Sequence, residues 1–135
     1  LEGGLVAPEK MRRVILCSGK VYFDLLEARD AAGIEDVYIM RVEQLYPVPV
    51  GPLLAELEPY AHAQMVWCQE EPRNMGAWSF IEAEIENVLK TLSATHTRPA
   101  YAGRAAAAST ATGQMSRHLK QRDAFLQSAL IDPLD

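Results

Sequence analysis

The sequence predicts an α/β fold in which helices cover both faces of a mainly parallel sheet, that is, a three-layer α/β/α sandwich. Two observations indicate this: β-prone runs alternate with helical patterns, and the runs at 13–17 and 63–68 are almost continuously apolar. Alternation favours parallel βαβ units, and a strand that is apolar on both sides is typical of a sheet buried on both faces. The 135 residues, 49% of them hydrophobic, suffice for one domain with its own core.

Four segments are expected to be strands. They are RVILC at 13–17, DVYIMRV at 36–42, AQMVWC at 63–68 and RPAYAG at 98–103. The first three are dominated by apolar residues that favour strands, whereas the fourth is a weaker candidate.

The intervals between these strands carry helical patterns. Helices are expected at 21–33, 50–60, 75–92 and 112–130. In the third, the apolar residues fall on one stripe: Trp78, Ile81, Ile85, Val88, Leu89 and Leu92. Gly33 and Pro59 supply stops for the first two helices.

The two ends of the chain are expected to lie outside the domain. Residues 1–11 contain LEGGLVAPEK, whose glycines and proline are typical of a linker, residues 12–131 form the domain, and 132–135 are a tail. The chain begins at Leu1 and shows nothing like a signal peptide. We therefore expect a piece of a longer protein.

Composition excludes several classes of function. The net charge is −5 without a basic cluster, so nucleic-acid binding has no electrostatic support. No run of about 18 apolar residues occurs, so no membrane span is expected. His62, His96 and His118 fall in expected loops or turns, none beside a nucleophile or carboxylate at a telling spacing, so we expect none to be catalytic.

Two cysteines, Cys17 and Cys68, each lie in an apolar run. Buried free thiols in a reducing compartment are the favoured interpretation, and a disulfide is the alternative. No Cys/His pattern with metal-ligand spacing occurs, so no metal site is expected.

In a parallel sheet, ligands bind beyond the carboxyl ends of the strands. At the first such corner, Ser18 could cap the following helix, Gly19 allows a tight turn, and Lys20 could hold an anion at the helix N-terminus. Arg41, at the end of the second run, would join them if the two strands are neighbours, and Arg104 could add to the site. The alternative is an ordinary helix start with a solvated lysine.

Another corner, WCQEEPRNMGAW at 67–78, presents two adjacent carboxylates, Glu70 and Glu71. Pro72 biases Glu71 toward an extended conformation. Neighbours on an extended segment point to opposite sides, which does not suit an acid and a base acting on one atom. We expect a structural or interface role, with one acid facing a basic partner.

The other residues of this corner are expected to shape the connection between the third strand and the third helix. Asn74 is expected to cap the next helix, and Gly76 would let its first turn approach another part of the chain. Trp67 and Trp78 could form an interface or pack in the core; the sequence leaves both open.

The segments LCSGK, RVEQLYP, QEEPRNMGAW and YAGRAAAASTATG together resemble the C-terminal domain of the thiamine-diphosphate-dependent component of 2-oxoglutarate dehydrogenase. The resemblance covers residues 12–130. More widely, the order of elements is similar to the C-terminal domain of the transketolase superfamily.

The resemblance implies a parent enzyme that decarboxylates 2-oxoglutarate on thiamine diphosphate with magnesium. It passes succinyl to the lipoyl groups of a dihydrolipoyl succinyltransferase, as a homodimer in the bacterial cytoplasm or mitochondrial matrix. Its cofactor site lies in other domains, so this fragment is expected to hold no cofactor, metal or catalytic residue. Glu70 and Glu71 do not match the family's carboxylate that activates the cofactor.

Three roles are left open. The fragment could be a structural or dimerisation domain, or a regulatory module that binds a phosphate-bearing effector at Ser18, Lys20 and Arg41. The parent could also act on a related 2-oxoacid such as 2-oxoadipate.

Overall fold

The computed structural model describes residues 4–43, 48–104 and 115–134, with side chains at all of these except 104 and 115–122. Four parallel strands form one sheet in the order β2-β1-β3-β4. The strands are β1 (Arg13–Cys17), β2 (Val37–Arg41), β3 (Gln64–Pro72) and β4 (Ala100–Arg104). The helices are α1 (Val21–Ala31), α2 (Val50–Leu57), α3 (Trp78–Thr91) and α4 (Met115–Leu130), with short 3-10 turns η1 (Pro8–Lys10) and η2 (Glu58–Tyr60).

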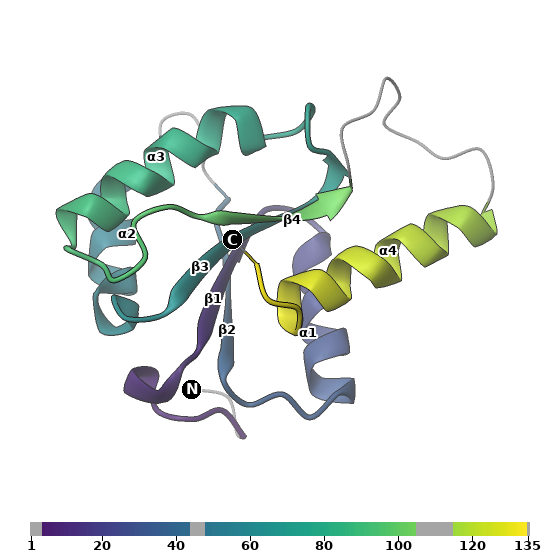
Figure 1. Cartoon of the computed structure of the whole chain (residues 1–135), viewed down its shortest axis with the longest axis horizontal. Coiled ribbons are helices and arrows are strands. Elements are labelled where there is room, and N and C mark those ends of the chain that lie inside the picture. The colour runs from purple at the N-terminus through teal and green to yellow at the C-terminus, as the bar shows by residue number, and fades with distance from the viewer. Residues whose placement is uncertain (1–3, 44–47, 105–114, 135) are drawn as a thin grey trace.

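The helices cover both faces of the sheet, which confirms the expected α/β architecture (Figure 1). Because side chains alternate along a strand, Val14 and Leu16 of β1 pack beneath α2 and α3, whereas Ile15 and Cys17 pack beneath α1 and α4. All five residues of β1 are buried, as its continuous apolar run predicted.

Two boundaries at the WCQEEPRNMGAW corner differ from expectation by three residues or more. The third strand continues to Pro72 instead of ending at Cys68, with a register irregularity between Gln69 and Pro72. The third helix begins at Trp78, later than the expected start at 75. Both differences arise at the WCQEEPRNMGAW corner.

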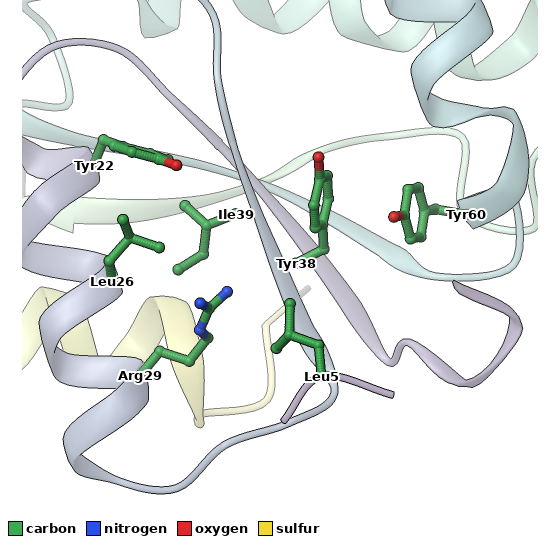
Figure 2. Close-up of a pocket in the computed structure, with 7 residues that line it drawn as sticks. All are labelled: Leu5, Tyr22, Leu26, Arg29, Tyr38, Ile39 and Tyr60. Atoms are coloured by element: carbon green, nitrogen blue, oxygen red, sulfur yellow. The ribbon is translucent and has the colours of Figure 1, made fainter. Parts of the chain in front are cut away.

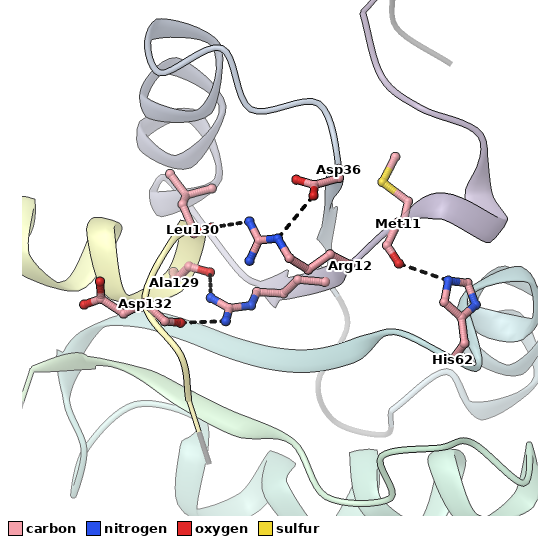
Figure 3. A network of polar contacts seen from close by, with 8 residues as sticks. Met11, Arg12, Asp36, His62, Ala129, Leu130 and Asp132 are labelled. Carbon is pink, nitrogen blue, oxygen red and sulfur yellow. Dashed lines mark hydrogen bonds and ion pairs between the residues drawn. The ribbon is translucent and has the colours of Figure 1, made fainter.

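Two arginines at the start of the first strand bind the C-terminal end of α4 (Figure 3). Arg12 Nη2 donates to the carbonyl of Leu130 at 2.8 Å and pairs with Asp36 at 3.3 Å. Arg13 Nη1 donates to Ser128 O at 3.1 Å and Ala129 O at 2.7 Å. These carbonyls lie in the last turn of α4, where helix groups have no intrahelical partner. Burial lowers the pKa of Arg13.

The ends of the described chain pack on the domain. Met11 is 1% exposed, and the Val6 N–H donates to Glu35 O at 3.0 Å. At the other end, Gln64 Nε2 donates to Leu134 O at 2.6 Å. Both contacts lie in stretches that the sequence assigned to a linker and a tail. Among the described helices, none has the length and apolar character needed to cross a membrane.

Candidate functional site

The residues singled out from the sequence gather where the four parallel strands end. Cys17, Arg41 and Cys68 are register partners on β1, β2 and β3, and Arg104 ends β4 opposite Pro72. The connections that follow β1 and β3 therefore lie next to each other at the edge where parallel sheets bind ligands.

The turn from β1 to α1 depends on Gly19, whose φ of 77° is in the left-handed region that glycine tolerates best. The capping prediction for Ser18 is wrong: the N-cap residue is Lys20, and no side chain caps the helix. The Tyr22 and Phe23 amides donate to the carbonyls of Gly19 and Lys20 at 3.3 and 3.0 Å. Those two N–H groups are thus already engaged within the turn.

Lys20 is paired with carboxylates. Its ammonium donates to Glu70 on β3 and lies 3.6 Å from Asp24, one turn along α1. The hydrogen bond to Glu70 is the main reason that the pKa of Lys20 is raised. The Lys20 side chain is 69% exposed, so an anion could reach it but would compete with two carboxylates.

Arg41 turns toward another set of partners. Its Nε lies 2.8 Å from Glu43, and its guanidinium carbon lies 5.0 and 5.4 Å from the ring centroids of Tyr22 and Phe23. The structure thus brings Lys20 and Arg41 to the same edge of the sheet, where they pair with different acids. The side chain of Arg104 lies outside the described residues.

Gln69 organises the corner between β3 and α3, a role that no sequence motif indicated. Its side chain is 3% exposed. The carboxamide oxygen accepts from Trp67 Nε1 at 2.9 Å and from the Trp78 N–H at 3.1 Å. The amide nitrogen donates to the carbonyls of Pro72 at 3.0 Å and Met75 at 2.8 Å. One buried amide thus joins the end of the strand to the start of the helix.

The capping prediction for Asn74 is therefore wrong. The helix begins at Trp78, and the first-turn amide of Trp78 is satisfied by Gln69, nine residues earlier. Gly76 has a φ of 66°, and a Cβ there would lie 3.1 Å from both Gln69 Oε1 and the Glu71 Cβ. This close approach is the one expected of Gly76.

The two acids behave differently, as their extended segment predicted. Glu70 binds Lys20, whereas Glu71 is exposed. Pro72 is buried at the end of β3. Glu70 and Glu71 are therefore not arranged as a pair of carboxylates around one reacting atom.

Both tryptophans pack in the core between the sheet and the α2–α3 layer, Trp67 from β3 and Trp78 from the start of α3, with 1% of Trp67 and 5% of Trp78 exposed. Of the two interpretations left open for them, core packing matches these contacts. Trp78 also packs against Tyr101, 5.2 Å between centroids, and the guanidinium of Arg73 lies over both rings.

Cys17 and Cys68 are buried free thiols, as expected. Burial raises the pKa of Cys17 to about 12 and also raises that of Cys68. Neither thiol is therefore suited to act as a nucleophile near neutral pH.

Within residues 4–43, 48–104 and 115–134, no group of three His, Cys, Asp or Glu side chains could hold a metal ion. Lys20 and Arg41, two of the cations at the strand ends, pair with acids. The described residues consequently do not fit thiamine diphosphate with its magnesium. His62 Nε2 lies 2.9 Å from Met11 O, just before β1 begins and so at the opposite end of the strands from this site. His96 is exposed. The side chain of His118 is outside the described part.

Comparison with known proteins gives a consistent result. The pattern of a family described as 2-oxoglutarate dehydrogenase C-terminal matches residues 2–130. Proteins named 2-oxoglutarate dehydrogenase E1 component from Brucella anthropi, Brucella ovis and Brucella canis are each 63% identical over 121 residues. The alignment covers 90% of this chain but only 12% of each relative.

Proposed function

Since the chain belongs to the 2-oxoglutarate dehydrogenase C-terminal family, we propose that it is the C-terminal domain of an E1 component. The whole enzyme would decarboxylate 2-oxoglutarate on thiamine diphosphate and magnesium. It would then transfer succinyl to the lipoyl groups of a dihydrolipoyl succinyltransferase. The observation that carries this proposal is the 63% identity to named E1 components over 90% of the chain.

We infer that the domain's own contribution is structural. Its acids at the strand ends, Glu70 and Glu43, are paired with Lys20 and Arg41, and Gln69 is used to connect β3 to α3. The domain would support a homodimer and pack on the rest of its own polypeptide. The relatives named above are bacterial, and the bacterial cytoplasm is the proposed compartment.

Assays of the isolated chain test whether cofactor binding and catalysis reside outside this domain. We expect calorimetry to show that the isolated chain does not bind thiamine diphosphate with magnesium. We also expect an activity assay to show no release of CO2 from 2-oxoglutarate. The longer polypeptide, assayed in parallel, should do both. Turnover by the isolated chain would refute the proposal. Turnover of 2-oxoadipate in preference to 2-oxoglutarate by the longer polypeptide would assign the related enzyme instead.

Dimer support has a separate test. Sedimentation of the chain at several concentrations should show self-association that rises with concentration. A strict monomer would count against a dimerisation role for the domain alone.

A second function, binding of a phosphate-bearing effector at Ser18, Lys20 and Arg41, stays a prediction. It is favoured by the exposure of Lys20 beside the strand ends. Calorimetry with a CoA ester or an adenine nucleotide should give heat with the wild type that Lys20→Ala removes. Lys90→Ala is the matched control, because Lys90 is another exposed lysine that pairs with an acid, Glu86, at 3.2 Å. Absence of heat with the wild type would reject the effector site.

A further inference from the structure

A cavity of about 330 Å³ lies beside β2, between α1 and the side chains of Leu5 and Tyr60 (Figure 2). It is lined mainly by apolar and tyrosine side chains, and also by Arg29. The guanidinium of Arg29 donates to the carbonyl of Val37 at 3.3 Å and lies 3.3 Å from Asp30, so the domain itself uses this charge. Among the described residues that line the cavity, none therefore carries a charge that lacks a partner.

Arg73, at the corner between β3 and α3, differs from the other arginines whose side chains the structure describes. Those others bind carboxylates or backbone carbonyls: Arg12, Arg13, Arg29, Arg41 and Arg98. Arg73 is exposed, and its guanidinium forms no ion pair or hydrogen bond with any described residue, including the exposed Glu71. Its contacts are with two rings, whose centroids lie 5.8 Å away in Trp78 and 5.2 Å away in Tyr101.

The contact with the rings determines which part of Arg73 is available to a partner. A guanidinium that lies over an aromatic ring uses its flat face, whereas its N–H donors point outward in its own plane. These donors form a fork that matches a carboxylate through two parallel hydrogen bonds. Arg73 is therefore held in place while its donors stay available to an acid from outside the domain.

The turn that carries Arg73 is fixed by contacts within the domain. The Met75 N–H donates to Pro72 O at 2.9 Å, which closes the turn around Arg73. Gln69 Nε2 donates to the carbonyls of Pro72 and Met75, and Gln69 Oε1 accepts from the Trp78 N–H at 3.1 Å, which positions one of the two rings. Because the turn is already ordered, a partner that binds Arg73 avoids much of the entropy cost of ordering it.

We propose that Arg73, held on the rings of Trp78 and Tyr101, is the docking site for an acidic segment of the longer polypeptide. A carboxylate of that segment accepts hydrogen bonds from the guanidinium of Arg73. Arginine, tryptophan and tyrosine are the residues that most often dominate the binding energy of protein interfaces. The proposal rests on the structural role proposed for the domain, and it names a surface through which the domain packs on the rest of its own polypeptide.

Three observations favour this occupant. The chain spans only 12% of the length of its relatives, so such proteins have ample polypeptide outside this domain. An exposed guanidinium without an acidic partner in the described part of the domain is complementary to a carboxylate. The domain also carries a net charge of −5, so two copies of it repel each other as a whole, which disfavours a second copy as the occupant.

Hydrogen exchange at the amides of residues 71–74 tests the proposal. In the isolated chain, these amides should exchange at the same rate at every protein concentration. In the longer polypeptide, we expect their exchange to slow by about tenfold or more. Equally fast exchange in both would overturn the docking site, and would leave the enzyme assignment intact if the longer polypeptide still releases CO2 from 2-oxoglutarate. Protection that grows with the concentration of the isolated chain would make a second copy the occupant, and would overturn the proposal as well.

Two substitutions of Arg73 separate its charge from its contact with the rings. In the longer polypeptide, Arg73→Glu should return exchange at 71–74 to the rate of the isolated chain, because it places a carboxylate opposite the acidic segment. Arg73→Lys keeps the positive charge but loses the planar fork, so part of the protection should remain. Equal exchange in the two variants would contradict pairing with an acid.

A matched control is Arg98→Glu, because Arg98 is 85% exposed and lies just before β4 begins, away from the corner that carries Arg73. This variant of the longer polypeptide should keep the full protection at 71–74. Arg73→Glu should also leave exchange at 71–74 unchanged in the isolated chain. If it sped exchange there as much as in the longer polypeptide, Arg73 would only stabilise its own turn, and the proposal would fail.

Discussion

Gln69 is the residue on which the corner between β3 and α3 depends. Its buried amide satisfies two N–H donors and several carbonyls at once. No local pattern marks such a role, because glutamine is usually exposed and the partners of Gln69 become its neighbours only after the chain turns. The sequence did indicate Gly76, whose close approach is to this side chain.

Replacement of Gln69 by leucine should strongly destabilise the domain. The indole N–H of Trp67, the amide of Trp78 and the carbonyls of Pro72 and Met75 would lose their partner. Buried unpaired groups cost roughly 1–3 kcal/mol each, so we expect a loss of about 3–5 kcal/mol in urea unfolding. The exposed Gln127, changed to leucine, should shift stability by less than about 0.5 kcal/mol. Equal effects of the two changes would contradict this role.

The buried thiols predict a pH dependence of stability. Burial raises the pKa of Cys17 to about 12 and also raises that of Cys68, whereas unfolded thiols ionise near 8.5. Protons therefore leave the unfolded state first, so stability is complete below about pH 8.5 and falls as pH rises above it.

Urea unfolding between about pH 7.5 and 9, where tyrosines are still almost wholly protonated, measures this effect. Each thiol should contribute a decline of up to about 1.4 kcal/mol per pH unit. The double variant Cys17→Ala and Cys68→Ala should flatten the profile. A wild-type profile as flat as that of the variant would show that the thiols do not titrate differently on folding.

At the scale of elements, apolar periodicity predicted the strands and helices well. The run at 13–17 became β1, and the helix at 50–60 gave α2 followed by η2, which includes Pro59. The wrong predictions concern the ends of elements, such as the end of β3 and the start of α3, where contacts with distant residues determine the boundary. Likewise, the pairing of Lys20 with Glu70 requires that β1 and β3 be neighbours. Local patterns do not reveal strand order.

The attachment of α4 gives a prediction at this scale. Arg13→Met would remove the guanidinium bonds to the carbonyls of Ser128, Ala129 and Asp132, the last at 2.6 Å. We expect a loss of about 3 kcal/mol or more, with faster amide exchange in α4 than in β3.

Arg98→Met is the control, because Arg98 is 85% exposed and pairs only at the surface with Glu86. It should change stability by less than about 0.5 kcal/mol. If α4 exchanged as slowly in Arg13→Met as in the wild type, the arginine would not anchor the helix.

For the whole molecule, the sheet brings Lys20, Arg41 and Glu70 to the edge where the strands end, and each of these charges is paired within the domain. Glu70 with Lys20 and Glu43 with Arg41 form pairs, and Gln69 serves the fold. This pairing is in keeping with the proposed structural role of the domain in a longer polypeptide. The parallel sheet and its helices followed from the pattern of the sequence, whereas the pairing of charges needed three-dimensional neighbours.

Decarboxylation of 2-oxoglutarate by the longer polypeptide carrying Glu70→Gln and Glu71→Gln tests this most directly. The assay uses saturating thiamine diphosphate and magnesium, and sedimentation confirms that the assembly of the variant is unchanged. We predict that kcat stays within a factor of about three of the wild-type value. Loss of a general acid or base would instead lower the rate about 100-fold or more. A drop of that larger size in a folded, correctly assembled variant would show that this corner takes part in the chemistry.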